Sequence, residues 1–346
     1  MRILVTGGAG YIGSVLVPKL VERGHEVRVL DRMFWGIPHF AELQNVELVN
    51  ADVRRMPEGV LDGIDAVDHL AGFSNDPTSE ASPDANWQMN AVATETIAQL
   101  CRASGVRRLV FGSSASLYDG AGDSDALLDE QSAISPRGAY ATSKRFGEEA
   151  LLRAAGGEFE PVILRQATVF GASERMRFDL VVNSFVKDAL VRQRLILHGG
   201  GRMWRPLVSV NDLADAHVAC LEAPSEAVAG QTFNVVGENY QVRELARTVA
   251  DALEALGRPV TLEDGPLPNI VRNYKVTGAK LRERLNLSLP TTPEVAVQEL
   301  VQRYGKLPAE HFGHPRFYNI AWMELLEKTR PAYQAMPNIF EPIDEA

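Results

Sequence analysis

The chain has 346 residues, of which 45% are hydrophobic and 23% are charged, and its formal net charge is −10. A chain of this length can bury a large core and form one large domain or two coupled ones. The negative charge and the lack of a basic block argue against a nucleic-acid partner. No apolar run approaches the ~18 residues of a membrane span, and a strand-like sequence begins at Arg2, so we expect a soluble cytoplasmic protein that binds no membrane.

Cysteine and histidine patterns give no sign of a metal or a disulfide. Cys101 and Cys220 stand far apart in apolar helical patterns, which predicts two buried structural thiols. His311 and His314 are three residues apart, but a glycine and a proline adjoin them. We therefore predict no metal site.

The first segment of the chain reads as strand, glycine turn, helix and strand. A short buried-type strand at 3–6 leads into the turn of residues 7–13, and a helix at 15–22 precedes a second strand at 26–31. The turn carries Gly7, Gly10 and Gly13, and an acid, Asp31, follows eighteen residues after the last of them. This context predicts a dinucleotide-binding fold.

Each part of this segment has a separate physical purpose. Gly7 allows the tight turn, Gly10 lets the backbone approach a diphosphate, and Gly13 lets the helix pack on the strand. The carboxylate of Asp31 would accept hydrogen bonds from the adenosine ribose and repel a 2′-phosphate, which favours NAD. NADP stays open because the adjacent Arg32 could neutralise such a phosphate.

Strands and helices continue to alternate through the N-terminal half. Further strands are expected at 46–50, 66–70, 107–111 and 161–165, and helices at 86–103 and 140–154. This alternation predicts an α/β fold with a Rossmann-like, doubly wound parallel sheet and helices on both faces. Ligands bind such sheets at the carboxyl ends of the strands. Candidate residues at those ends are Asp52, Val53, Leu70, Ala71, Gly72, Ser113 and Ser114.

Tyr140 and Lys144, in the segment Ala-Tyr-Ala-Thr-Ser-Lys, are spaced to share one helix face. The ammonium of Lys144 would lower the pKa of the Tyr140 phenol from its usual value near 10. A phenol with a lowered pKa can take a proton from an alcohol. Beside a nicotinamide, this pair predicts alcohol–ketone chemistry.

Together these motifs resemble the extended short-chain dehydrogenase/reductase family, the nucleotide-sugar epimerases and dehydratases, from residue 1 to about 305. The resemblance implies that Ser114 is the third catalytic residue beside Tyr140 and Lys144. It also implies a set of NAD-binding residues, which are Gly7, Gly10, Tyr11, Ile12, Gly13, Asp31, Arg32, Asp52, Val53, Leu70, Ala71, Gly72, Asn90, Ser113, Tyr140 and Lys144.

The same resemblance divides the chain and assigns substrate contacts. It implies an NAD-binding domain at 1–171 with return segments at about 205–236, and a smaller mixed α/β substrate-binding part at 172–204 and 237–310. A helix is expected at 176–190. Residues 311–346 form an aromatic tail, either packed on the body or acting as a lid or subunit contact. The implied substrate-binding residues are Ser114, Thr168, Asn183, Arg205 and Arg272, with the two arginines on a nucleotide diphosphate.

The resemblance leaves the reaction open among three readings. Dehydratases and decarboxylases of the family carry acidic residues where this chain has Ala115 and Ser116, which counts against both chemistries. We predict an NAD-dependent nucleotide-sugar epimerase, with an NAD(P)H-dependent ketoreductase as the alternative and a non-catalytic dinucleotide-binding regulator as a minor one. The helices at 86–103 and 140–154 match the pair that makes the family's four-helix dimer interface, so we expect a homodimer.

Overall fold

The central sheet of the computed structural model carries the predicted Rossmann-like arrangement. The model describes residues 1–121, 126–267 and 272–335, and within them the sheet has seven strands, all parallel. In spatial order these are β11 (Thr232–Val235), β7 (Glu160–Gln166), β5 (Arg108–Ser114), β4 (Ala66–His69), β1 (Arg2–Thr6), β2 (Glu26–Asp31) and β3 (Val46–Asn50).

Because the strands are parallel, their carboxyl ends meet along one edge of the sheet. The glycine turn follows β1, Asp31 closes β2, and Ser114 closes β5. The register aligns Thr6 with Leu30 and with His69 of β4, so these ends lie level with one another. The edge therefore gathers most of the candidate residues predicted from the sequence.

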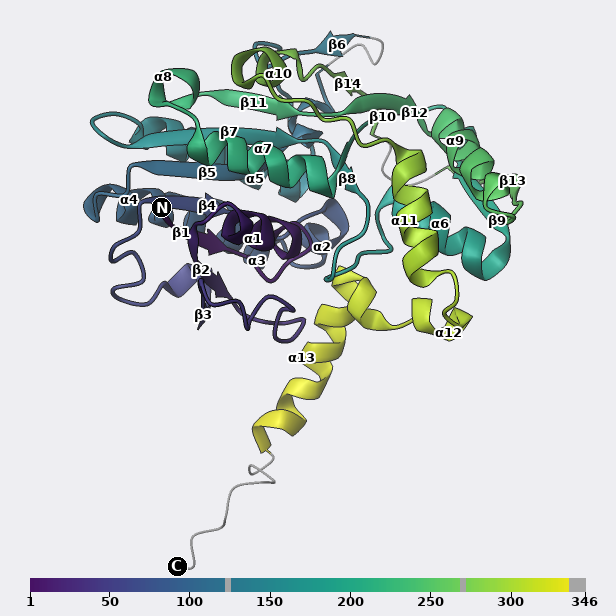
Figure 1. Cartoon of the computed structure of the whole chain (residues 1–346), viewed down its shortest axis with the longest axis horizontal. Coiled ribbons are helices and arrows are strands. Elements are labelled where there is room, and N and C mark those ends of the chain that lie inside the picture. The colour runs from purple at the N-terminus through teal and green to yellow at the C-terminus, as the bar shows by residue number, and fades with distance from the viewer. Residues whose placement is uncertain (122–125, 268–271, 336–346) are drawn as a thin grey trace, which may run out of the picture.

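Helices cover both faces of this sheet (Figure 1). On one face α1 (Gly13–Glu22) packs against α7 (Val210–Glu222), and on the other α4 (Ala93–Ala103) packs against α5 (Gly138–Ala154). The remaining helices of this half are short: α2 (Asp76–Ala81), α3 (Pro83–Trp87) and α8 (Ser225–Val228).

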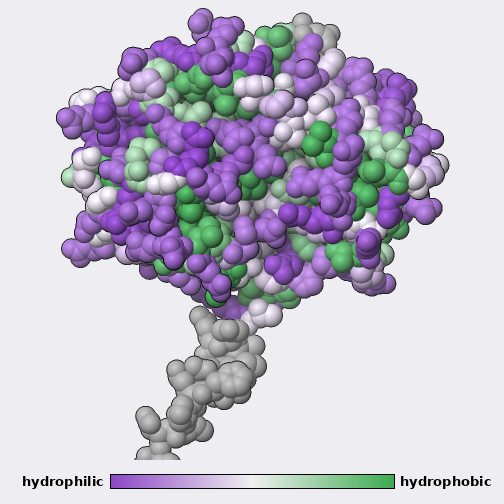
Figure 2. Space-filling view, in the orientation of Figure 1, coloured by the Kyte–Doolittle hydropathy of each residue, from purple (hydrophilic) through white to green (hydrophobic). Residues whose placement is uncertain are grey.

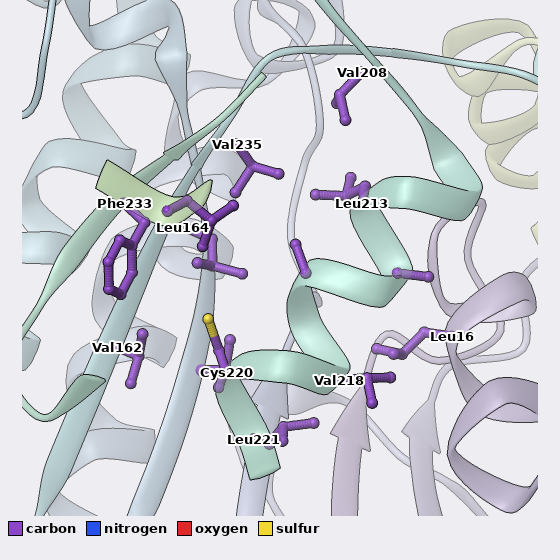
Figure 3. Close-up of a cluster of buried hydrophobic side chains, with 14 of the residues drawn as sticks. Leu16, Val162, Leu164, Val208, Leu213, Val218, Cys220, Leu221, Phe233 and Val235 are labelled. Carbon is purple, nitrogen blue, oxygen red and sulfur yellow. The ribbon is translucent and has the colours of Figure 1, made fainter. Parts of the chain in front are cut away.

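The core follows the alternation of side chains along the strands. Ile3 and Val5 of β1 belong to the cluster under α1 and α7, whereas Leu4 faces the cluster under α4 and α5. Figure 3 shows the first cluster. Side chains of α7, among them Leu213, pack against the strands on one side of the helix and against Leu16 of α1 on the other. This packing fixes the sheet and the position of the glycine turn.

A smaller part with its own core lies beside the sheet (Figure 1). Three short sheets contribute to it and to the connections: β8 (Thr168–Phe170) with β10 (Trp204–Ser209) and β12 (Glu238–Gln241); β9 (Arg194–His198) with β13 (Thr261–Gly265); and β6 (Leu127–Leu128) with β14 (Lys275–Val276). Its helices are α6 (Val181–Arg192), α9 (Val242–Ala255), α11 (Pro293–Tyr304) and α12 (Ala309–Phe312), whereas α10 (Ala279–Leu285) packs on β11 at the edge of the central sheet.

Two predicted helices differ from the structure in their limits. The helix expected at 176–190 begins only at Val181, because residues 172–180 form a buried loop. The helix expected at 86–103 contains a π-helical turn at Gln88–Val92 between α3 and α4. Cys101 and Cys220 are buried free thiols, as predicted.

The tail packs on the body at its start and then extends away from it. A 3₁₀ turn at Pro315–Phe317 leads into α13 (Asn319–Ala335), whose later turns project from the molecule in Figure 1. Residues 336–346 of the predicted aromatic tail, which include Met336 and Phe340, lie outside the described residues, as do residues 122–125.

The surface seen in Figure 2 is mostly hydrophilic, with smaller hydrophobic areas between the charged residues. Within the described part of the chain, every helix is too short or too polar to cross a lipid bilayer.

Candidate active site

A cavity of about 300 Å³ opens at the carboxyl edge of the sheet, and residues of both parts of the molecule line it. Most of the residues predicted for cofactor and substrate line it. These are Gly7, Gly10, Tyr11, Ile12, Gly13, Asp31, Arg32, Val53, Leu70, Ala71, Gly72, Ser113, Ser114, Tyr140, Thr168 and Arg272. The structure therefore brings these candidate residues together in one cavity along the sheet edge.

The glycine turn is built so tightly that side chains would not fit. Gly7 has a φ of +74°, and a Cβ there would lie 2.6 Å from the backbone nitrogen of Ala71. A Cβ on Gly13 would lie 2.3 Å from the carbonyl oxygen of Gly8, because α1 starts directly against the turn. The turn thus presents bare backbone and the first amides of α1 to the cavity, which suits a phosphate.

Asp31 is held in place at the end of β2. Its carboxylate accepts hydrogen bonds from the backbone nitrogen of Ala9 at 3.1 Å and of Met33 at 2.8 Å. Burial nevertheless raises the pKa of Asp31 above its usual value. Arg32 forms an ion pair with Asp52 at 2.7 Å, and Asp52 lies outside the cavity wall.

Tyr140 lies in the first turn of α5, lines the cavity and is 7% exposed. Burial raises the pKa of its phenol to about 12, while a side-chain hydrogen bond with Ser114 and the charge of Arg177 act in the opposite direction. The expectation that Lys144 lowers this pKa is not met in the protein alone. Desolvation outweighs the charges, and the nearby cation that acts on Tyr140 is Arg177.

Lys144 lies one turn further along α5, behind the cavity wall. Its ammonium donates a hydrogen bond to the carbonyl oxygen of Gly112 at 2.8 Å and lies 4.7 Å from the centre of the Phe111 ring. Burial lowers the pKa of Lys144 to about 8, against the opposing charge of Glu148. The helix spacing predicted a shared face correctly, but it could not show that the ammonium is anchored to β5.

The two candidate serines at the end of β5 have different partners. Ser114 acts to lower the pKa of the Tyr140 phenol, and its hydroxyl donates to the hydroxyl of Ser116 at 3.0 Å. Ser113 donates to Glu148 on α5 at 2.5 Å. Ser114 is therefore the serine that faces the phenol.

Three further candidates have their polar groups committed elsewhere, and two of them hold loops. Asn90 donates to the carbonyl oxygen of Phe73 and accepts from its nitrogen, so it holds the loop after β4. Asn183 is fully buried and bonds to the backbone of residues 171 and 177 and to the hydroxyl of Tyr11. Both lie outside the cavity wall, where they organise the loops that form it.

Arg205 is the third of these candidates. It lies next to Arg272, and the resemblance assigns both arginines to a nucleotide diphosphate. Arg272 lines the cavity and forms an ion pair with the buried Asp76. Arg205 lies behind it and donates to the backbone carbonyl oxygens of Trp204 and Arg272. Arg272 thus adjoins the cavity, while Arg205 supports the segment that carries Arg272.

Sequence reasoning missed two buried arginines of the loop 172–180, Arg175 and Arg177, which both line the cavity. Arg177 forms an ion pair with Asp179 at 2.8 Å and donates to Ser74 at 3.2 Å. The signal in the sequence is the pattern Arg-Met-Arg shortly after Gly171. This pattern is easily missed because the loop lacks the hydrophobic periodicity of a helix or strand.

Comparison with known proteins identifies the family of this chain. The model of the NAD dependent epimerase/dehydratase family matches residues 3–236, more than half of the sequence. The chain belongs to this family.

Individual relatives in this comparison carry different activities. The UDP-glucose 4-epimerase of Corynebacterium glutamicum is 31% identical over 283 residues, 77% of this chain and 84% of the relative. The 2-alkyl-3-oxoalkanoate reductase of Stenotrophomonas maltophilia is 31% identical over 273 residues, 75% and 77% of the two chains. Among solved structures, the UDP-glucose 4-epimerase of Thermus thermophilus in complex with NAD has a TM-score of 0.76 and 26% identity, covering 89% of this chain and all of that one.

The residues of the cavity fit NAD, the cofactor of the family. The bare turn at Gly7–Gly13 suits the diphosphate, and the half-buried carboxylate of Asp31 suits the adenosine ribose. Arg32, the residue that could have favoured a 2′-phosphate, is paired with Asp52. NAD is therefore the cofactor that both the family and these residues support.

Proposed function

We propose that this protein is an NAD-dependent nucleotide-sugar epimerase that inverts a hydroxyl-bearing carbon through a transient keto-sugar. One observation carries the proposal. Tyr140 and Ser114 line the cavity together and Ser114 acts to lower the pKa of the phenol, while Asp31, at the cofactor end, is the one carboxylate among the described residues that line it. Proton transfer at the reacting carbon then depends on the phenol.

In this proposal each residue has a separate task. Tyr140, as phenolate, takes the proton from the sugar hydroxyl and later returns it to the keto oxygen. Ser114 donates a hydrogen bond that fixes the reacting oxygen against the phenol. Lys144 is anchored to Gly112, so it ties α5, which carries Tyr140, to β5, which ends at Ser114, and in this way positions the pair. NAD, when bound, supplies the hydride acceptor for the oxidation and the hydride donor for the reduction.

The local structure after β5 supports epimerisation over elimination. Ala115 and Ser116 start a buried 3₁₀ turn, and the hydroxyl of Ser116 is bonded to Ser114. Neither side chain can act as the acid or base that removes water or assists a decarboxylation at neutral pH. The dehydratase and decarboxylase chemistries of the family therefore receive no support from these positions.

A nucleotide-diphosphate sugar is the substrate we propose. Arg272 adjoins the cavity near Tyr274 and carries the charge that a diphosphate requires. Thr168, at the start of β8, lines the same cavity. The names of the relatives from Corynebacterium and Thermus point to UDP-sugars as the first candidates.

A ketoreductase is the second candidate. The relative named 2-alkyl-3-oxoalkanoate reductase is as similar to this chain as the Corynebacterium epimerase. The Tyr140–Ser114 pair serves carbonyl reduction equally well, since it donates a proton to the oxygen that hydride attack generates. The two functions differ in whether reduced cofactor is consumed.

Turnover without added cofactor tests the proposal. Purified protein is incubated with UDP-, GDP- and dTDP-hexoses, and the products are identified by NMR. We expect one nucleotide sugar to be converted to its epimer until both reach a fixed ratio. If no sugar is converted, but NADH is oxidised stoichiometrically with a keto substrate, the protein is a reductase.

We also propose that the protein is a homodimer built on the helices of the α4–α5 face. Trp87, Leu100 and Leu152 are 38%, 37% and 43% exposed, and all three belong to the helices at 83–103 and 138–154. Large exposed apolar side chains on one pair of helices are typical of an interaction surface.

A further inference from the structure

Arg175 is a buried cation in the cavity wall that the proposed reaction does not use. It comes from the loop 172–180, is 8% exposed and lines the cavity together with the glycine turn. Its guanidinium lies 3.9 Å from the centre of the Trp35 ring. One of its terminal nitrogens donates to the side-chain oxygen of Asn319, the first residue of α13.

The guanidinium has unused hydrogen-bonding capacity. Its Nε is buried and has no hydrogen-bond partner within the described part of the chain. Buried polar atoms in folded proteins are nearly always paired, so an unpaired one in a cavity wall indicates a missing ligand. Because arginine offers five donors in a fixed fork, the natural ligand is an anion with several oxygens.

The charges around Arg175 locate it at the cofactor end of the cavity. Burial lowers its pKa and so does Arg177, while Asp179, Tyr11 and Asp31 raise it. A guanidinium keeps its proton in such surroundings. Tyr11 belongs to the glycine turn, and Asp31 closes β2, so Arg175 approaches the two features that hold the dinucleotide.

A strap from the C-terminal segment crosses this end of the cavity. We use the name strap for residues 315–323. Its backbone and side chains bond to the loop after Asp31: the indole nitrogen of Trp35 donates to the carbonyl oxygen of Arg316 at 3.1 Å, and that of Trp322 donates to Phe34 at 2.6 Å. Asn319 and Met323 of the strap line the cavity.

Asn319 connects the strap to Arg175 and to the sheet. Its side-chain oxygen accepts from Arg175, and its side-chain nitrogen donates to Ser74, in the loop after β4, at 2.9 Å. The residue is 8% exposed. The strap thus holds the guanidinium from one side while Trp35 supports its flat face from the other.

We propose that Arg175 binds the diphosphate of the bound NAD, and that the strap positions Arg175 and closes the cofactor end of the cavity. The diphosphate rests on the amides of the turn from one side, and the guanidinium neutralises it from the other. The proposal depends on NAD as the cofactor and not on which reaction the enzyme performs.

The diphosphate of the substrate is a less suitable ligand for Arg175. Arg272, the arginine proposed for the substrate diphosphate, pairs with Asp76 and acts on Tyr274. Tyr274 in turn affects the pKa of Tyr140. None of these groups is among those that act on Arg175.

Binding of two cofactor fragments tests the assignment. The Arg175→Met variant keeps most of the side-chain volume and removes the charge. After removal of bound NAD, titration calorimetry measures the Kd of ADP-ribose, which contains the diphosphate, and of adenosine, which lacks it. We expect ADP-ribose to bind at least about tenfold more weakly and adenosine to bind as in the wild type.

Arg316→Met is the matched control, since Arg316 is an exposed arginine of the same strap. It should change neither Kd. Arg175→Lys should recover part of the lost affinity for ADP-ribose because it restores the charge. Equal weakening of both fragments by Arg175→Met, or no weakening, would overturn the assignment. So would a variant that keeps its NAD but binds UDP more weakly.

Retention of NAD tests the strap. In Asn319→Ala we expect purified protein to release NAD faster than the wild type by at least about tenfold, measured by fluorescence after dilution. The double variant with Arg175→Met should be little worse than Arg175→Met alone, because Asn319 acts through Arg175. Additive losses would overturn the positioning role. Equal melting temperatures of the ligand-free variants and wild type show that folding is not the cause.

Discussion

Tyr140 shows how a residue's chemistry depends on contacts that its spacing does not reveal. The position of Lys144 four residues away suggested that the ammonium acidifies the phenol. In the structure the ammonium donates to Gly112 behind the wall, and burial raises the pKa of Tyr140. The cation that acts on the phenol, Arg177, comes from a distant loop. In the proposed reaction, formation of phenolate would therefore depend on Arg177 and on the positive charge of bound NAD.

The first prediction concerns the phenol itself. Tyr140→Phe removes the proton acceptor and leaves the ring, so NAD should bind with unchanged affinity. Turnover should fall by about 10²–10⁴-fold, the usual contribution of a general base. Single-turnover kinetics and calorimetry with NAD measure the two quantities. Normal turnover in this variant would contradict the proposed mechanism.

A second prediction concerns pH. Arg177 favours the phenolate, so Arg177→Met should raise the pKa of Tyr140 further. Activity that requires phenolate rises with pH, and in the variant this rise should move to higher pH. Arg177→Lys, which keeps the charge, should shift the profile less. An unchanged pH dependence of kcat/KM in Arg177→Met would show that Arg177 has only a structural role.

The residues whose place at the cavity could be predicted from the sequence belong to local motifs. Gly7, Gly13 and Asp31 are positioned by a turn and two neighbouring strands, so their spacing alone places them. Asn183 and Arg205 were assigned by resemblance, and the structure has them holding loops instead. The loop that carries Arg175 lacks the hydrophobic periodicity of a helix or strand, so the position of Arg175 could not be predicted from the sequence.

At the scale of elements, α5 combines the proposed catalytic residues with a structural task. It carries Tyr140 and Lys144 in its first turns and Glu148 one turn later. Glu148 forms a buried ion pair with Arg165 of β7 at 2.8 Å and accepts a hydrogen bond from Ser113. These two contacts hold α5 against β7 and β5 and so fix the position of Tyr140 above the sheet.

The third prediction tests this tie. Glu148→Gln leaves the buried guanidinium of Arg165 without its counter-charge, which should lower the free energy of unfolding by about 3–5 kcal/mol. The matched control is Glu149→Gln, which removes the exposed partner of Arg145 on the same helix and should cost about 0.5 kcal/mol or less. Urea denaturation measures both. Equal effects of the two variants would contradict a structural role for the buried pair.

Elements were predictable where hydrophobic strands alternate with helices. The strand at 26–31 and the strand at 46–50 agree with the structure in both limits. The π-helical turn at 88–92 and the late start of α6 could not be read from the sequence, because long-range packing of Asn90 and of the loop 172–180 determines them.

For the whole molecule, the fourth prediction concerns assembly. Analytical ultracentrifugation should show a dimer at micromolar concentration. Leu100→Glu places a charge on the exposed helical surface and should shift the equilibrium toward monomer by at least about tenfold. Leu256→Glu is the control, since Leu256 is 41% exposed at the end of α9, away from these helices. A wild-type monomer, or equal effects of the two variants, would rule out this interface.

The fate of the hydrogen on the reacting carbon tests the central claim most directly. The protein, without added cofactor, is given a nucleotide sugar that it accepts, labelled with deuterium at the carbon that it epimerises. The proposed epimerase oxidises and reduces the same carbon within one cavity, so NMR should find the deuterium still on that carbon of the epimer. Loss of the label to solvent or to free cofactor, or a product that has lost water or carbon dioxide, would contradict the account.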